Sequence, residues 1–296
     1  MLCSTVCFAA DPIRVELDYA PITFDQDPMI VNDRTMVPVR AIFEAMGASV
    51  EWNAETQTVT SRLGNLTVVM VIDNPVMTIN GGIKTMDTAP IIRGGRTLVP
   101  VRAVSESFGC EVAWDGNKRL VSIFSQDFQK RIETADSFGY VKQLTDGTKK
   151  ANAAFGLSYF HDYTVKTDTA DGTVIEISAT SDAGHASLNI RTDLYSGKEE
   201  PPTEAYAESV AEGIVTVLSG TLIYAGVTKI NGTDFVEITY TAPGIVHGIT
   251  DMDPETTIYI ARKNGVVYTM TYTVHGEVNK DTRSDFGYMI HSMLIA

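Results

Sequence analysis

The sequence has little cysteine, which excludes a disulfide-rich fold. Of the three cysteines in 296 residues, Cys3 and Cys7 lie within the first ten positions, and only Cys110 lies in the remainder of the chain. Small secreted domains that lack a sufficient core are usually held together by several disulfides. This chain is long enough to bury a core in each of two domains, so we expect its stability to come from packing.

Positive charge is also scarce. The chain carries 23 Lys and Arg against 37 Asp and Glu, for a formal net charge of -14. Such a field repels nucleic acids and anionic membrane surfaces. No stretch after the N-terminus is apolar for long enough to span a bilayer. We therefore expect neither a nucleic-acid partner nor a membrane span.

Histidine is missing from the first half of the chain, and common nucleophile motifs are missing throughout. There is no Gly-x-Ser-x-Gly elbow, and Cys110 lies in the half without histidine. No histidine has a neighbour at metal-ligand spacing, so surface or capping roles are expected and no cofactor is indicated. The five histidines are His161, His185, His247, His275 and His291.

The first ten residues are apolar and uncharged and are followed by polar Asp11 and Pro12. This pattern is typical of the end of a secretory signal, with small residues at Cys7 and Ala9 placed for cleavage. We interpret residues 1–10 as a signal peptide remnant and expect an extracellular protein, either secreted or associated with the cell surface. The alternative is a cytoplasmic protein with an apolar N-terminus.

One octapeptide occurs twice. Arg-Thr-Met-Val-Pro-Val-Arg-Ala at residues 34–41 returns as Arg-Thr-Leu-Val-Pro-Val-Arg-Ala at residues 96–103. The similarity extends without a gap over a first copy, residues 20–53, and a second copy, residues 82–115. Two copies are too few for a solenoid, so we expect a tandem repeat packed as one bilobed domain.

Each copy has the pattern of a short helix on antiparallel strands. Pro38 is placed to begin a helix, because its missing N–H needs no partner there. Gly47 is placed to end it in a left-handed conformation. Apolar and polar residues alternate around Trp52, which indicates a strand of a hairpin.

These features resemble the copper amine oxidase N-terminal-like stalk domain of secreted and surface proteins of Gram-positive bacteria, over residues 11–124. The resemblance implies an accessory domain without the oxidase. An amine oxidase needs a quinone-forming tyrosine in an Asn-Tyr context and a His-x-His copper arrangement, and this sequence contains neither.

Two pairs of equivalent residues in the copies are candidate ligand contacts. Arg40 and Arg102 could bind carboxylates of wall peptides or acidic glycans. Alternatively, each could bind turn carbonyls or pair with Glu44 or Glu106 one helical turn later, and the repetition favours this structural role. Trp52 and Trp114 are predicted to be core residues rather than sugar-stacking platforms.

The second half has a different pattern. Residues 125–150 are predicted to form a helix, which Ser125 could cap, and a linker. From residue 151 to 296 we expect three strands, a helix after Thr203, two hairpins, and a final helix that begins at Thr282. The hairpin turns are Asn231-Gly232 and Asn264-Gly265. This order predicts an antiparallel sheet with helices packed against it.

This half resembles the PsbP-like family of small α/β/α sandwiches, through its middle helix, the strand at residues 234–240 and the run at residues 261–272. The opening strand, residues 157–163, lacks the proline-tryptophan motif often found there. Members of that fold class are mostly binding or assembly modules, so the resemblance implies no reaction.

One acidic loop, residues 251–255, could present oxygens to Ca²⁺. Asp251 and Asp253 have the spacing of the start of an EF-hand loop, but the sixth position is Thr256 and the twelfth is Arg262, where glycine and an acidic ligand are required. An ordinary acidic loop is the simpler interpretation. Together with His247, these residues form the candidate site of an alternative function, an unrecognised hydrolase or metal-binding protein.

The sequence as a whole predicts an α+β protein in which a duplicated stalk domain is followed by a PsbP-like sandwich. We expect a non-catalytic protein whose stalk presents a ligand- or partner-binding module. A cell-wall component or a surface protein is the expected partner.

Overall fold

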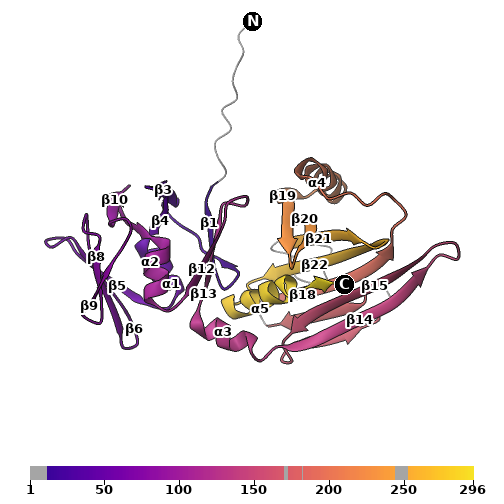
Figure 1. Ribbon diagram of the computed structural model, residues 1–296, viewed down its shortest axis with the longest axis horizontal. Helices are drawn as coiled ribbons and strands as arrows, with labels where there is room; N and C mark the ends of the chain where they lie inside the picture. The colour runs from indigo at the N-terminus through magenta and orange to yellow at the C-terminus, as the bar shows by residue number, and fades with distance from the viewer. Residues whose placement is uncertain (1–11, 170–172, 182, 244–252) are drawn as a thin grey trace, which may run out of the picture. The chain divides into compact units, whose positions relative to one another are not determined.

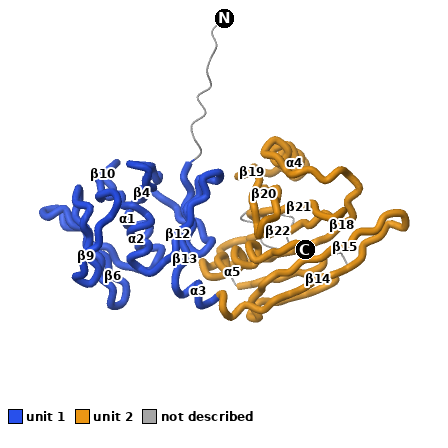
Figure 2. Tube along the Cα trace, viewed as in Figure 1, with its two compact units in different colours: residues 1–131 blue, residues 132–296 orange. Residues whose placement is uncertain are grey.

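The structure is a computed structural model that describes residues 12–169, 173–181, 183–243 and 253–296. It divides into two compact units, unit 1 (residues 1–131) and unit 2 (residues 132–296), shown in Figure 2. The signal remnant, residues 1–10, and the loop that holds His247 and Asp251 lie outside the described residues.

Unit 1 is built from three small sheets and short helices (Figure 1). The sheet orders are β5-β6-β7-β8-β9, β10-β11-β4-β3 and β12-β13-β1-β2. The strands are β1 (Arg14–Leu17), β2 (Ala20–Pro21), β3 (Met29–Val31), β4 (Arg34–Pro38), β5 (Ser49–Asn53), β6 (Thr58–Leu63), β7 (Leu66–Val71), β8 (Val76–Ile79), β9 (Gly82–Thr85), β10 (Ile91–Arg93), β11 (Arg96–Pro100), β12 (Glu111–Asp115) and β13 (Leu120–Phe124). The helices are α1 (Val39–Ala45), α2 (Val101–Ser107) and α3 (Gln126–Ile132).

The two octapeptides pair with each other at the centre of unit 1. Strands β4 and β11 are antiparallel, with Val37 opposite Val99, and both valines are fully buried. Because Met36 lies opposite Pro100 and Pro38 opposite Leu98, the pairing is symmetric about the two valines. Equivalent residues of the two copies therefore exchange places across the ladder.

Two ion pairs have the same reciprocal arrangement. Arg34 Nε lies 2.8 Å from Asp87 Oδ2, and Arg96 Nη2 lies 2.7 Å from Asp25 Oδ2. Each arginine thus binds the aspartate of the other copy. All four side chains are about half exposed, so each pair contributes at most about 1 kcal/mol. These ion pairs are informative for their reciprocal arrangement rather than for the free energy that they contribute.

The outer strands are also exchanged between the copies. Strand β1 pairs with β13 in parallel, with Val15 opposite Val121 and Leu17 opposite Ile123. Strand β8, which precedes the second copy, and β9, which begins it, join β5 of the first copy through β6 and β7. One continuous core results, and it contains buried residues from both copies.

Helices α1 and α2 follow the sequence prediction closely. Val39, Ile42 and Phe43 of α1 are buried, and the ring of Phe43 lies 5.0 Å from that of Phe108. Gly47 and its equivalent Gly109 take the predicted left-handed conformation, with φ of +81° and +76°. Helix α1 begins one residue later than expected, because Pro38 still belongs to β4.

The prediction that the tryptophans are core residues is wrong. Trp52 is 40% exposed and Trp114 is 41% exposed. Each lies on an edge strand, β5 or β12, of which only Val50 or Val112 packs against the core cluster. The far end of each strand extends past the core and presents its indole to solvent.

The junction differs from the predicted helix and linker. Ser125 does cap α3, because its Oγ accepts a hydrogen bond of 3.1 Å from the N–H of Phe128. The predicted linker, however, contains the ten-residue strand β14 (Asp136–Thr145). Phe138, Tyr140 and Leu144 lie half-buried on one face of it, a period-two pattern that polar neighbours obscured in the sequence.

Unit 2 has a seven-stranded sheet of order β16-β17-β18-β22-β21-β20-β19 and a three-stranded sheet of order β14-β15-β23. All strand pairs in both sheets are antiparallel. The remaining strands are β15 (Lys150–Tyr159), β16 (Thr164–Thr167), β17 (Ile175–Thr180), β18 (Gly184–Leu194), β19 (Thr221–Ile230), β20 (Thr233–Thr241), β21 (Glu255–Lys263), β22 (Val266–Gly276) and β23 (Leu294–Ile295). The helices are α4 (Glu204–Leu218) and α5 (Lys280–His291).

The two helices of unit 2 cover opposite faces of the seven-stranded sheet. Phe235 of β20 packs in the cluster that includes Phe286 of α5, whereas its neighbour Val236 packs in the cluster that includes Ala207 of α4. Adjacent residues of a strand point to opposite faces. The predicted layering of helices against an antiparallel sheet is therefore present.

Local details of the two helices differ from the sequence prediction. Ser219, rather than Gly220, takes the left-handed conformation after α4, with φ of 53°. Val217 is 83% exposed, because Ala207, Ala211 and Val215 form the stripe that packs on the sheet. Helix α5 begins at Lys280 with Asn279 as its N-cap, and the side chain of Asn279 accepts the N–H of Thr282.

Asp285 of α5 is buried beside a tyrosine. The hydroxyl of Tyr163 donates a hydrogen bond of 2.7 Å to Asp285 Oδ2. Burial and the adjacent Asp285 hold the pKa of Tyr163 well above its usual range. The hydroxyl therefore remains a donor at physiological pH.

We expect that neither half of unit 1 folds alone, because each lacks the partner of its central strand. Residues 12–72 and residues 73–131 should each show no cooperative thermal transition by circular dichroism. An equimolar mixture should recover the transition of the intact segment 12–131. A cooperative transition in either half alone would contradict the exchanged-strand arrangement.

Removing the hydroxyl of Tyr163 should destabilise unit 2. Tyr163→Phe takes one donor from the buried Asp285, and the loss of a hydrogen bond to a buried group costs about 1–3 kcal/mol. Urea denaturation of the full chain measures the change in the free energy of unfolding. Tyr159→Phe, at another half-buried tyrosine of the same unit, is the matched control and should change it less.

Candidate functional site

A pocket in unit 1 is lined mainly by residues of the second copy. Its volume is ≈ 470 Å³, which is within the range of small-molecule sites. Strand β9 supplies Lys84, helix α2 supplies Arg102 and Glu106, and strand β12 supplies Trp114. The pocket thus combines charged groups of both signs with an aromatic side chain.

Arg102 is the cation of this pocket that has no anionic partner. Within the described part of the chain, its guanidinium makes no hydrogen bond or ion pair. Glu106, one turn further along α2, pairs with Lys84 across 3.5 Å. The carboxylate that could have paired with Arg102 is therefore paired with Lys84 of β9 instead.

The equivalent arginine of the first copy, Arg40, does have an anionic partner. Arg40 Nη1 lies 3.6 Å from Glu44 Oε1, as the helical spacing predicts. Ile22 occupies the position that aligns with Lys84, so no lysine competes for Glu44. The expected pairing with the glutamate one turn later is present for Arg40, and among the described residues it is not present for Arg102.

Trp114 forms an aromatic wall of the pocket. It lies opposite Val121 in the β12–β13 ladder, and both residues line the cavity. Within the described residues its indole N–H has no hydrogen-bond partner. An exposed indole offers a flat apolar face and one donor at its edge.

A second wall consists of the reciprocal ion pair that involves Arg34 and Asp87, both of which line the pocket. The guanidinium of Arg34 also donates to the backbone carbonyl of Asp33, 3.1 Å away. Asp33 itself lines the pocket with an exposed carboxylate. This wall therefore offers fixed acceptors beside the unpaired Arg102.

The remaining candidate contacts of the sequence analysis do not gather in one described site. Asp253 is exposed and precedes β21. Asp251 and His247 lie outside the described residues. Glu255, the third acidic residue of that loop, is already part of β21 and lies 3.9 Å from Arg283.

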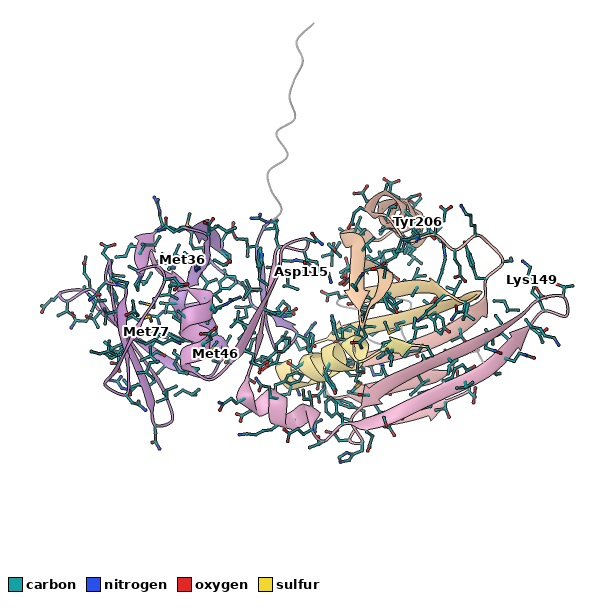
Figure 3. The ribbon with its side chains drawn as sticks, in the orientation of Figure 1. Met36, Met46, Met77, Asp115, Lys149 and Tyr206 are labelled. Atoms are coloured by element: carbon teal, nitrogen blue, oxygen red, sulfur yellow. The ribbon has the colours of Figure 1, made fainter. Side chains whose placement is uncertain are left out.

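Unit 2 has a smaller pocket of ≈ 250 Å³ beside α4. Arg262 lies between the rings of Tyr195 and Tyr206, 4.8 and 4.7 Å from their centroids. Its guanidinium also donates to the hydroxyl of Tyr206, which Figure 3 places on α4. Because Arg262 already contacts both rings, its role is to hold α4 against the sheet and not to bind a ligand.

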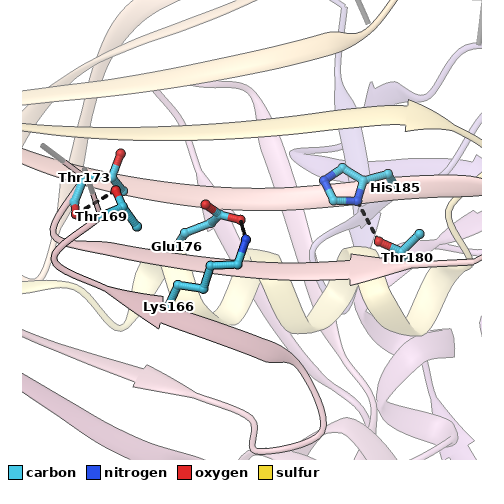
Figure 4. A network of polar contacts seen from close by, with 6 residues as sticks. All are labelled: Lys166, Thr169, Thr173, Glu176, Thr180 and His185. Carbon is cyan, nitrogen blue, oxygen red and sulfur yellow. Dashed lines mark hydrogen bonds and ion pairs between the residues drawn. The ribbon is translucent and has the colours of Figure 1, made fainter. Parts of the chain in front are cut away.

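The described histidines are dispersed over unit 2. His185 and His275 lie opposite each other on β18 and β22, with ring centroids 6.2 Å apart. Nδ1 of His185 lies 2.9 Å from the hydroxyl of Thr180 (Figure 4). Burial and the neighbouring His185 lower the pKa of His275. Nδ1 of His291 lies 2.8 Å from the carbonyl of Gly287 within α5, a capping arrangement.

Within the described residues, no group of three or more His, Cys, Asp or Glu side chains is placed to hold a metal ion. No helix in the same part of the chain is long and apolar enough to cross a bilayer.

The repeated motif pointed to Arg102, and Trp114 was considered as a sugar-stacking residue, but nothing in the sequence indicated that Lys84 and Glu106 lie in the same pocket. The signal for Lys84 was its difference from Ile22 at the aligned position. That difference indicates a change in ion pairing only once β9 is known to lie beside α2. The exposure of Trp114 had no local signal, because alternation along a strand does not show where the core ends.

Two solved structures are similar to the chain at a low level. The solution structure of cyanobacterial PsbP (CyanoP) from Synechocystis sp. PCC 6803 has a TM-score of 0.35 and 10% identity, and the match covers 54% of this chain and 94% of that one. A crystal structure of a protein from Bacteroides thetaiotaomicron has a TM-score of 0.27 and 11% identity, covering 48% of this chain and 45% of that one. No curated protein sequence matched.

A family match covers most of unit 1. It confirms the resemblance of the first part of the chain, and its boundaries run from β1 to β13. Residues 16–123 match the family model of the copper amine oxidase N-terminal domain, a non-catalytic stalk-type domain.

Proposed function

We propose that the chain is a secreted or cell-surface protein without catalytic activity, in which unit 1 acts as a stalk and unit 2 binds a surface partner. The apolar N-terminal residues support secretion, since they have the composition of a signal peptide. The family match of residues 16–123 supports the role of unit 1. The net charge of -14 keeps such a protein in solution.

We further propose that unit 1 is a duplicated unit. The proposal is supported by the aligned octapeptides, by the symmetric pairing of β4 with β11, and by the reciprocal ion pairs of Arg34 and Arg96. Independent segments would have no reason to share these three features. A duplicated, interlocked core gives a rigid spacer from little sequence.

An exposed apolar cluster on unit 2 carries the proposal of partner binding. Val217, Leu218, Leu222 and Ile223 are 83%, 43%, 39% and 55% exposed, where α4 ends and β19 begins. Strand β19 is an edge of the seven-stranded sheet. Apolar side chains grouped at a strand edge are typical of protein–protein contacts. The partner would be a surface protein.

Retention on surface fractions tests the proposal. The full chain, residues 12–131 and residues 132–296 are passed separately over immobilised surface proteins and over purified cell wall from a Gram-positive bacterium. We expect surface proteins to retain the full chain and unit 2. Val217→Asp with Ile223→Asp should reduce this retention about tenfold, as the loss of central apolar contacts does in other interfaces.

The matched control adds the same charge elsewhere on α4. Ser209→Asp with Thr216→Asp changes two exposed polar residues of this helix and should leave retention unchanged. Equal losses in both double variants would show a general charge effect and contradict the proposal. Retention of unit 1 and not of unit 2 by the surface proteins would contradict the proposal.

A further inference from the structure

We propose that the Arg102 pocket of unit 1 binds a sugar that carries a carboxylate, such as a hexuronate residue. The inference does not depend on partner binding by unit 2. It rests on three features of the pocket: an unpaired guanidinium, an exposed indole face, and carboxylate acceptors around them.

The guanidinium of Arg102 provides the charge recognition. Arginine presents a planar fork of donors that matches a carboxylate with two parallel hydrogen bonds. In this pocket the other cations are already paired, Lys84 with Glu106 and Arg34 with Asp87. An incoming carboxylate therefore has one favoured partner.

The indole of Trp114 provides the surface for the ring. One face of a pyranose carries several C–H groups and is apolar enough to lie on an aromatic side chain. Trp114 is 41% exposed and lines the same cavity as Arg102. A ligand that lies on this indole can reach Arg102 with a substituent at its edge.

The remaining polar groups suit hydroxyl groups rather than a second charge. Hydroxyls both donate and accept. The carboxylates of Asp33, Asp87 and Glu106 can accept from them, and the hydroxyls of Thr35 and Thr85 can do either. A bare aliphatic acid has no hydroxyl groups to contact these residues, so the lining favours a polyhydroxylated ligand. The volume of ≈ 470 Å³ accommodates one or two sugar rings.

Comparison with the first copy explains why only one site is expected. Arg40 is neutralised by Glu44, because Ile22 cannot draw that carboxylate away. In the second copy Lys84 does so, and Arg102 is left unpaired. The substitution between Ile22 and Lys84 thus separates a structural arginine from a binding arginine in otherwise similar surroundings.

Titration of the purified full chain with sodium glucuronate and sodium galacturonate tests the site. Trp52→Phe leaves Trp114 as the one tryptophan, so its fluorescence reports on the pocket. We expect a saturable change with the uronates. Binding of glucose and of methyl-esterified glucuronate should be at least about tenfold weaker, the expected cost of losing one charge-assisted contact.

Variants of the two arginines separate the roles. Arg102→Gln should weaken uronate binding about tenfold, whereas Arg40→Gln should leave it unchanged. Lys84→Ile recreates the first-copy arrangement, so Glu106 is free to pair with Arg102 and binding should fall severalfold. Adding Glu106→Gln to Lys84→Ile should restore it, because the competing carboxylate is gone.

Three results would overturn the proposal. Equal binding of glucose and glucuronate would remove the role of Arg102, and equal binding of acetate and glucuronate would remove the role of the sugar ring. No fluorescence or NMR chemical-shift change at high uronate concentration, with the thermal unfolding of the protein intact, would remove the site. None of these results depends on whether unit 2 binds a surface protein.

Discussion

The pairing of β4 with β11 is the contact on which unit 1 depends. Val37 and Val99 face each other in a buried ladder, which β3 and β10 flank in the same sheet. Helices α1 and α2 continue directly from these strands, so the ladder also sets the positions of Arg40 and Arg102. The exchanged outer strands then close one core over both copies.

Because the two copies are arranged symmetrically, a single sequence difference between them can change the ion pairs near one arginine. Arg40 pairs with Glu44, whereas Glu106 pairs with Lys84, which stands at the position that aligns with Ile22. Exposed ion pairs contribute little to stability. A change of ion-pair partners therefore alters the free energy of folding little, whereas it changes the charge presented to a ligand considerably.

Much of the local structure could be predicted from the sequence. Gly47 ends α1 because glycine readily adopts positive φ, and the hairpin turns of unit 2 follow from Asn-Gly pairs in the same way. The signals for these features lie within a few residues. Strand β14 was missed because only three of its ten residues are apolar and half-buried. The exchange of strands could not be predicted, since no local pattern states which distant strand a segment will join.

The parallel pairing of β1 with β13 has a consequence for the order of events during synthesis. Arg14 and Leu120 are partners, so the first strand of unit 1 must wait for more than a hundred residues before its neighbour exists. Pairings of such high sequence separation form late and slowly. Unit 1 therefore cannot complete its core until β13 has been made, although the successive neighbours from β5 to β9 can pair before then.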